Sequence, residues 1–415
     1  MRRSARNPIE RALNLGGAVK ILKVVDYFKP FWERGGTVRV PYEIALNLIQ
    51  RGHVVTVYAN GERADSPARV IQNRPVFVDG MTVYYFKTLS KRFTARTNID
   101  LPYFAPFVVR KHLREFDIVH IHTYRRVLAV PVWHYARRFR IPYVVQAHGS
   151  LSTYFLKGGQ KRLFDQLWGL KILREASKVI ALTPEEAGQY RTMGVAADRI
   201  EVIPAGVDLG AFEELPPKGT FRSAYGIGGN ERMVLYLGRI HRIKGLDLLV
   251  SAFAGLCNEL KEVRLVIVGG DDGYLRTLEQ MVKDLGIGDR VIFTGFLDGE
   301  IKLAAYVDAD VYVLPSLYEC FPTTVMEACA AGTPVIVTDA CQMAPQIENR
   351  VGLVVPGQAE RLQHAMKAIL TDGEMRARMA RNARAAVEEL WSMSRYVDRI
   401  ESVYRQVLEA RDLPR

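Results

Sequence analysis

The sequence predicts an α/β protein made of two doubly wound, Rossmann-like domains. Short apolar runs alternate with amphipathic stretches along the chain, and these runs are apolar at successive positions. Strands that are apolar on both faces are typical of parallel sheets covered by helices. Strand and helix in alternation indicate a doubly wound sheet. A break in this pattern divides the chain into two such series.

The first series predicts a domain over residues 1–205. Its expected strands are 19–28, 54–59, 117–122, 143–148, 178–183 and 200–204. A helical pattern follows Gly35-Gly36 and ends at Gly52. Residues 206–219 contain Pro216-Pro217 and no periodicity, which predicts a linker.

The second series predicts a domain over residues 220–385. Its expected strands are 233–239, 264–270, 291–296, 311–315 and 334–339. The tail beyond residue 374 has a helical apolar stripe but no following strand. We therefore expect a C-terminal helix over 386–415 that crosses back to the first domain. Ligands of open α/β sheets bind beyond the carboxyl ends of the strands, so the expected site is the cleft between the two sheets.

Composition excludes a disordered or fibrous chain, because 48% of the 415 residues are hydrophobic and 25% are charged. No apolar run approaches the roughly 20 residues of a membrane span, and the Arg-rich start has no secretory apolar core. We expect a cytoplasmic protein.

The four cysteines show neither C-x-x-C pairs nor zinc-ligand spacing, so free thiols are expected.

The net charge of +12 is concentrated in the first half. Residues 1–210 carry 33 Lys and Arg against 17 Asp and Glu, a balance of +16, whereas residues 211–415 carry 24 against 28, a balance of −4. The basic, aromatic segment 86–114 suits an anionic membrane surface on the inner face of the cell membrane, or nucleic acid. The alternative is a solvated basic surface over an ordinary helix.

Two segments carry candidate chemistry in the second domain. In GRIHRIKG (238–245), Arg239 and Lys244 stand between a strand end and a helix start, where cations and helix amides can hold a diphosphate. Exposed cations without a ligand are the alternative. In ECFPTTVME (319–327), Pro322 is expected at the first helical position, and the amides of Thr323 and Thr324 then form an anion site. Glu319 and Glu327 suit sugar or ribose hydroxyls.

These segments, together with VIPAGVD (202–208), resemble the retaining nucleotide-sugar glycosyltransferases of family GT4 from Val19 to about Tyr404. The resemblance implies a GT-B fold, in which two Rossmann-like domains face each other across a cleft. It further implies that Arg239 and Lys244 hold the donor diphosphate, Glu319 the donor sugar and Glu327 the ribose. The implied donor-binding residues also include Gly35, Gly36, Phe296, Cys320, Phe321, Thr323 and Thr324.

The resemblance also implies roles for three histidines. His148 matches a histidine near the reacting carbon of the donor sugar, and it is counted as catalytic with Arg239, Lys244 and Glu319. His120 and His122 alternate on one expected strand, so they share a sheet face, and they match the acceptor side. No D-x-D carboxylate pair lies near them, and the family needs no metal, so neither metal nor cofactor is expected. Many relatives have glycine where this chain has Cys320, which would strain a left-handed backbone.

The predicted function is transfer of a hexose-type sugar from a UDP- or GDP-sugar to a hydroxyl acceptor, on a lipid-linked molecule or a growing glycan, with retention of configuration. One alternative is a nucleotide-sugar epimerase of the same fold, which would act on the donor alone. The other is a non-catalytic nucleotide- or nucleic-acid-binding protein. No G-x-G-x-x-G follows the first strand, which argues against a dehydrogenase, and basic charge alone is weak support for nucleic acid.

Overall fold

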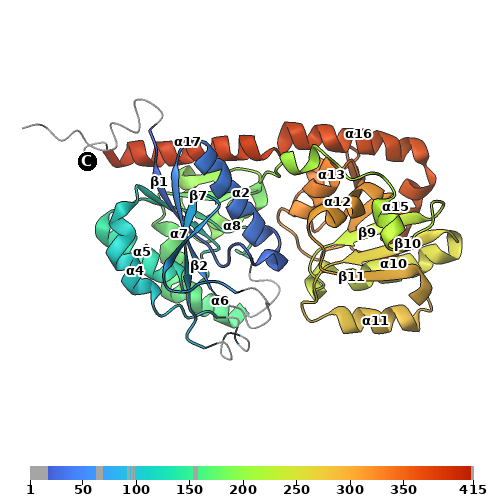
Figure 1. Cartoon of the computed structure of the whole chain (residues 1–415), viewed down its shortest axis with the longest axis horizontal. Coiled ribbons are helices and arrows are strands. Elements are labelled where there is room, and N and C mark those ends of the chain that lie inside the picture. The colour runs from blue at the N-terminus through green and yellow to red at the C-terminus, as the bar shows by residue number, and fades with distance from the viewer. Residues whose placement is uncertain are drawn as a thin grey trace, which may run out of the picture. The chain divides into compact units, whose positions relative to one another are not determined.

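The computed structural model describes residues 17–61, 69–90, 94, 97, 99–152 and 158–412. The chain divides into two compact units, Met1–Ile203 with Ser394–Arg415, and Pro204–Met393. Each unit has one sheet with helices packed on it (Figure 1). The predicted α/β class with two Rossmann-like sheets is confirmed.

The first unit holds an eight-stranded sheet in the order β3-β4-β2-β1-β5-β6-β7-β8. Neighbouring strands are parallel except for the hairpin of β3 and β4. Its strands are β1 Lys20–Val24, β2 Val54–Asn60, β3 Pro75–Val78, β4 Met81–Phe86, β5 Ile118–His122, β6 Tyr143–Gln146, β7 Lys178–Ala181 and β8 Ile200–Val202.

The α-helices of the first unit follow its strands and include the last helix of the chain. They are α2 Gly36–Gln50, α4 Ala105–His112, α5 Ala129–Phe139, α6 Gly158–Phe164, α7 Leu170–Arg174, α8 Pro184–Thr192 and α17 Met393–Asp412. A π-helical turn, Asp165–Gly169, joins α6 to α7. Alternate strand residues such as Leu22, Val119 and Ile121 enter a core with α4, α5, α7 and α8.

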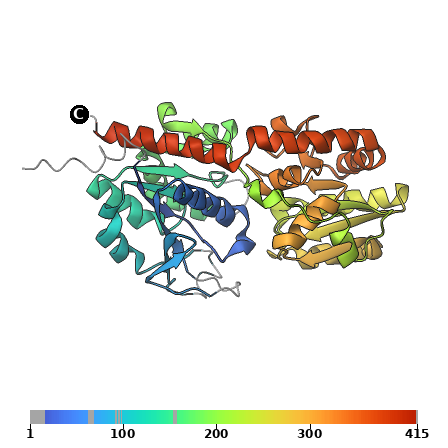
Figure 2. The same cartoon turned by 45° about the horizontal axis from the view of Figure 1, so that its top comes forward.

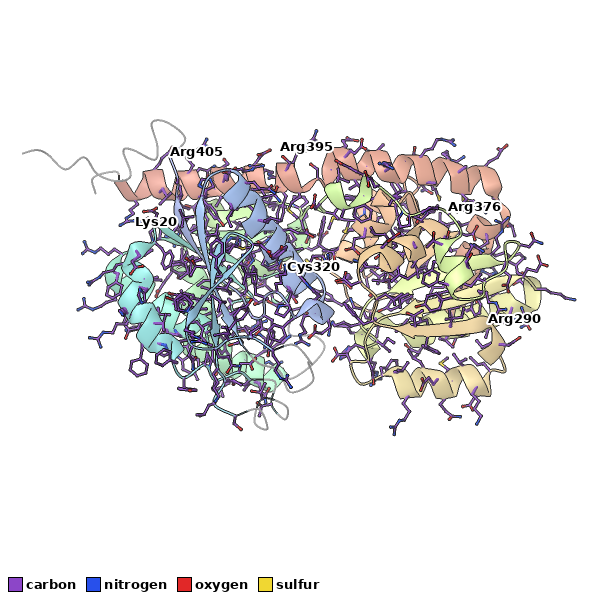
Figure 3. The ribbon with its side chains drawn as sticks, in the orientation of Figure 1. Lys20, Arg290, Cys320, Arg376, Arg395 and Arg405 are labelled. Atoms are coloured by element: carbon purple, nitrogen blue, oxygen red, sulfur yellow. The ribbon has the colours of Figure 1, made fainter. Side chains whose placement is uncertain are left out.

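Helix α17 runs along the first unit in both views (Figure 1, Figure 2). Its inner side is polar as well as apolar: the Tyr404 hydroxyl hydrogen-bonds His120 Nδ1 (2.6 Å), and the Tyr396 hydroxyl accepts from Gln146 Nε2 (2.6 Å). Arg395 and Arg405 lie on its exposed side (Figure 3). The helix therefore covers the sheet face that carries His120 and Gln146.

The second unit holds a six-stranded, all-parallel sheet in the order β11-β10-β9-β12-β13-β14. Its strands are β9 Arg232–Leu237, β10 Val263–Val268, β11 Val291–Gly295, β12 Val311–Leu314, β13 Val335–Thr338 and β14 Gly352–Val355. Its α-helices are α9 Thr220–Ala224, α10 Leu246–Glu259, α11 Leu275–Asp284, α12 Gly299–Asp308, α13 Thr323–Ala330, α14 Ala344–Ile347, α15 Ala359–Thr371 and α16 Gly373–Leu390.

The segment expected to be a linker is packed within the second unit. Val207 N–H donates to Trp391 O (2.8 Å), and Met393 N–H donates to Val207 O (3.0 Å). A Cβ on Gly206 would lie 2.7 Å from the Met393 Cα, so glycine allows this close approach. The helical tail also differs from expectation: it breaks between α16 and α17 at residues 391–392, not at residue 386.

Candidate functional site

The loop after β9 is bound to the loop after β12. Gly245 has φ 63°, and a Cβ there would lie 2.1 Å from the Pro315 carbonyl oxygen, which no other residue could tolerate without a shift. Leu317 N–H donates to Ile243 O (2.9 Å). Because β9 and β12 are neighbours in a parallel sheet, both loops leave the same carboxyl edge. Candidate residues on the two loops are thereby brought together.

Lys244 and Glu319 meet at this edge, although 75 positions separate them. The Lys244 Nζ donates to Glu319 Oε2, and only 15% and 18% of the two side chains are exposed. The Glu319 main chain is fixed by hydrogen bonds with Ala340 O (3.1 Å) and Gln342 N–H (2.9 Å). An ammonium has three donors, so Lys244 can hold an anion while it keeps Glu319 in place.

Arg239 is paired with a carboxylate that sequence reasoning missed. Its Nη1 donates to Asp272 Oδ2, on the loop after β10, and both side chains remain partly exposed. Asp272 N–H donates to Ile240 O (3.0 Å), and the Tyr236 hydroxyl donates to Arg239 O (2.8 Å). The position of Asp272 in the loop after β10, four residues beyond the strand end, is the weak signal that could have found it. A guanidinium carries five N–H donors, so Arg239 retains donors for a phosphate.

Helix α13 begins one residue later than expected. Pro322 has ψ 116° and precedes the helix, whose first residue is Thr323. Its fixed φ suits this capping position as well as the first turn. The first amides of an α-helix have no partner within the helix, so the start of α13 can still hold an anion. Thr324 Oγ1 accepts from the Tyr312 hydroxyl (2.7 Å), which ties this start to β12.

The two residues before Pro322 are buried. Cys320 is 5% exposed and Phe321 is 7% exposed. Cys320 does not take a left-handed φ. The backbone strain considered for this position is therefore absent.

Glu327 is 5% exposed and makes two strong contacts with α12. Its carboxylate accepts from Lys302 Nζ (2.7 Å) and from the Tyr306 hydroxyl (2.9 Å). The side chain therefore joins α12 to α13. A carboxylate has about four lone-pair positions, so these contacts leave acceptor capacity for ribose hydroxyls. The expectation that Glu327 binds ribose stays a prediction.

The remaining donor-side predictions fall on separate elements. Gly35 has φ 64° and precedes α2, and Gly36 is the first residue of that helix. A Cβ on Gly35 would have no neighbour within 4 Å, so its backbone conformation, not space, favours glycine. Phe296 follows β11, the outer strand of the second sheet, and is 48% exposed.

His148 lies in the first unit directly after β6, in a strained backbone conformation. Its φ is 51°, and Gly149 follows with φ 74°. For a residue with a side chain, the left-handed conformation costs about 1–2 kcal/mol. The His148 Nε2 lies 2.7 Å from His122 Nδ1, and the two rings are stacked. Such strain persists where the surroundings hold it, often at functional sites.

His120 and His122 share one sheet face, as predicted, and their rings stack with centroids 4.0 Å apart. They are 0% and 2% exposed, so neither ring is open to an acceptor in this structure. Lys23, opposite His120 in the register of β1 and β5, is also fully buried, and its Nζ has no hydrogen-bond partner among the described residues. Burial lowers the pKa of Lys23 to about 7.

The same burial lowers the pKa values of the histidines. Loss of hydration disfavours the charged form, and the charge of Lys23 acts in the same direction on all three rings. The pKa values of His120 and His122 fall well below the usual value, and that of His148 falls to about 3. His148 is therefore a neutral hydrogen-bonding group near pH 7.

All four cysteines are free, and Cys320, Cys329 and Cys341 are buried. Burial raises the pKa of Cys329 and Cys341. Within the ranges described, no group of three or more His, Cys, Asp or Glu side chains could hold a metal ion. Among those residues no helix is long and apolar enough to cross a membrane.

Two family models match this chain. "Glycosyltransferase Family 4" matches residues 34–211, and "Glycosyl transferases group 1" matches residues 217–386. A D-inositol 3-phosphate glycosyltransferase of Xylanimonas cellulosilytica is 30% identical over 85% of this chain and 88% of its own length. A protein of the same name from Nocardia farcinica is 29% identical over 85% and 80%.

Solved structures share the fold. Sucrose-phosphate synthase from Thermosynechococcus elongatus has a TM-score of 0.77 at 24% identity, over 94% of this chain and 100% of that one. Anabaena HepE, in complex with UDP-glucose, has a TM-score of 0.75 at 22% identity, over 94% and 100%. The fold, the two family models and the 30% identical relative thus identify a GT-B glycosyltransferase. This chain belongs to glycosyltransferase family 4, as the sequence resemblance predicted.

Proposed function

We propose that this chain is a retaining glycosyltransferase. It moves a hexose-type sugar from a UDP- or GDP-sugar to a hydroxyl of an acceptor. The second unit binds the donor, and the first unit supplies His148 and the acceptor side. HepE, which shares the fold, was crystallised with UDP-glucose, and this supports a nucleotide-sugar donor.

The observation that carries the proposal is the grouping of Lys244, Glu319 and the start of α13 at one sheet edge. Lys244 and the helix amides suit the diphosphate, which gains charge as it leaves. Glu319 is held by its main chain and by Lys244, so its second carboxylate oxygen is available to sugar hydroxyls. Arg239, on the same loop as Lys244, adds a second cation.

The chemistry we propose is substitution on one face of the sugar. The bond from the anomeric carbon to the β-phosphate oxygen breaks through an oxocarbenium-like state, and the acceptor oxygen attacks from the same face. The departing phosphate oxygen takes the acceptor proton. The protein contributes orientation and charge stabilisation, with no protein nucleophile.

A donor panel tests the function. Thermal unfolding is measured with UDP-, GDP- and ADP-sugars, because a ligand that binds the native state raises Tm. Release of nucleoside diphosphate is then followed with hydroxyl acceptors. We expect one donor to raise Tm and to be turned over only when an acceptor is added. Conversion of the donor with no acceptor present would instead identify an epimerase.

The acceptor panel begins with phosphorylated polyols. Several relatives are named D-inositol 3-phosphate glycosyltransferases, and the +16 balance of residues 1–210 suits an anionic acceptor. Inositol phosphate is compared with unphosphorylated inositol at low and high salt. A preference for the phosphorylated polyol that weakens with salt supports this acceptor class. Equal turnover of both polyols would exclude it.

The reaction is expected to need no metal and no cofactor besides the donor. Arg239, Lys244 and the amides at the start of α13 supply the positive charge that a bound Mg²⁺ would otherwise provide. Treatment with EDTA should leave kcat and KM unchanged within twofold. If EDTA abolishes activity and added Mg²⁺ or Mn²⁺ restores it, a metal ion and not these groups supplies the main positive charge at the diphosphate.

We also propose that the first unit rests on an anionic membrane surface. Helix α4 and the residues before it expose Tyr103, Phe104 and Phe107, the last at 68%, beside the exposed cations Arg110 and Lys111. Exposed aromatic and basic side chains together suit a membrane interface. Of the other basic residues in segment 86–114, Lys91, Arg92 and Arg96 lie outside the described residues.

Vesicle sedimentation tests this second proposal. Each basic residue near an anionic surface contributes about 1 kcal/mol, so Arg110→Ser with Lys111→Ser should weaken binding by about tenfold or more. Arg378→Ser with Arg381→Ser, which removes the same charge from exposed positions on α16, should have little effect. Equal binding of the wild-type chain to anionic and neutral vesicles would mean that the basic surface is only solvated.

A further inference from the structure

The turn that carries His148 is held by a buried carboxylate that the proposed chemistry does not use. Glu186 lies in the first turn of α8 and is fully buried. Its Oε1 accepts from the main-chain N–H of Gly149 (2.6 Å), and its Oε2 accepts from the N–H of Leu182 (2.7 Å). One carboxylate thus joins the turn after β6 to the end of β7.

The other main-chain groups of this turn are also held by buried or partly buried side chains. Ala147 N–H donates to the Tyr190 hydroxyl (2.9 Å), which lies on α8 one turn after Glu186. Arg125 Nη1 donates to the carbonyls of Ser150 and Leu151, the latter at 3.0 Å. Every residue from 147 to 151 except His148 therefore has a main-chain group fixed by a side chain from another element.

The ring of His148 is fixed from a different side. It hydrogen-bonds His122 on β5, and His122 stacks on His120, which hydrogen-bonds Tyr404 of α17. The main chain and the ring are thus held by separate groups, the main chain by Arg125 and two side chains of α8, and the ring by His122 of the sheet. Such double fixing is what a group needs when it must be in place before the reaction begins.

We propose that Glu186 and His122 are positioning residues for sugar transfer, Glu186 by fixing the left-handed turn at His148 and Gly149, and His122 by fixing the ring. This inference rests on the proposed function, in which His148 faces the donor sugar. Neither residue touches the substrate. Both act through His148 alone, which makes their effects testable by pairing them with a variant of His148.

Glu186→Gln is the sharpest change in the turn. Glutamine has the same shape but only one oxygen, so its side-chain NH₂ group faces one of the two main-chain N–H groups. Both groups are donors, and that hydrogen bond is therefore lost. We expect kcat to fall at least tenfold while the KM for the donor stays within twofold. The matched control is Glu185→Gln, an exposed neighbour on the same helix, which should behave like the wild type.

The decisive comparison repeats Glu186→Gln in a His148→Ala background. A residue that acts only through His148 should then lower kcat by less than twofold, because there is no ring to position. An equal loss in both backgrounds, or a Glu186→Gln enzyme within twofold of the wild type, would overturn the proposal.

His122 provides the second test, and it does not depend on the folding of Glu186→Gln. His122→Asn places an amide where the ring Nδ1 lies and should retain most of the activity, whereas His122→Leu should lose at least tenfold. Equal activities of the two variants would remove His122 from this role.

A readout separate from turnover is the imidazole NMR signal of His148, assigned by its absence in His148→Ala. It should show one tautomer in the wild type and broaden in Glu186→Gln. If the wild-type chain transfers no sugar, the proposed function fails. An unchanged signal in Glu186→Gln defeats the positioning claim by itself.

Discussion

Replacement of Lys244 or Arg239 by alanine lowers kcat/KM for sugar transfer by at least a hundredfold. Each variant loses a charge-assisted contact to a diphosphate whose charge grows in the transition state, a contact worth roughly 3 kcal/mol. Lys244→Ala also frees Glu319 from its ion pair at the sheet edge. We therefore expect this variant to lose more activity than Arg239→Ala, whose partner Asp272 is more exposed.

The matched control for this experiment is Arg242→Ala. Arg242 lies in the same short 3₁₀ turn as Lys244, carries the same charge and is exposed. Its removal should change kcat/KM by less than threefold. Thermal unfolding of all three variants separates loss of function from loss of fold. Near-native turnover by Lys244→Ala or Arg239→Ala would place that residue outside the site.

Acid is expected to destabilise the chain by about 4 kcal/mol between pH 7.5 and 5.5. His120, His122 and His148 have pKa values well below the ordinary histidine value of 6.5 in the folded protein. Below pH 6.5 the unfolded chain binds up to three protons that the folded chain does not. The three neutral rings therefore make their full contribution to the free energy of unfolding above pH 6.5, and this contribution is lost as the pH falls below that value. Each ring contributes about 1.4 kcal/mol over this interval.

Chemical denaturation at the two pH values measures this loss. Two other buried groups act in opposite directions. Burial raises the pKa of Glu186, which opposes the loss of stability at lower pH. Burial lowers the pKa of Lys23 to about 7, so this group adds to the loss as pH falls from 7.5 to about 7. His120→Asn should remove about a third of the difference, while substitution of the exposed His364 should leave it unchanged. A denaturation midpoint that is independent of pH over this range would show that the three rings titrate normally.

The fold class was predictable because most of the strands are buried on both faces. Runs such as 117–122 and 264–270 are apolar enough to be read without tertiary information. The hairpin of β3 and β4 was missed, although its Asp79-Gly80 turn has φ 46° and 84° and is a common hairpin signal. Its strand β3 lies at the sheet edge and is half exposed, so it carries little apolar pattern.

The candidate site was predictable only where local motifs mark it. Arg239, Lys244 and Glu319 follow strand ends, and the resemblance to a family assigns their roles. Asp272 carried only a weak signal, its position in the loop after a strand, and Glu186 carried none, because their partners are set by loops that meet only in the folded sheet. The sequence showed that His120 and His122 share a face, but it did not show that α17 covers that face.

The central claim is that this chain transfers a sugar from a nucleoside-diphosphate donor with retention of configuration. The most direct measurement is the anomeric configuration of the product, read by NMR from the H1–H2 coupling after reaction of an α-linked donor sugar in the glucose series. We expect an α-linked product, nucleoside diphosphate released in equal amount, and kcat/KM lowered at least a hundredfold in Lys244→Ala. A β-linked product would contradict retention of configuration.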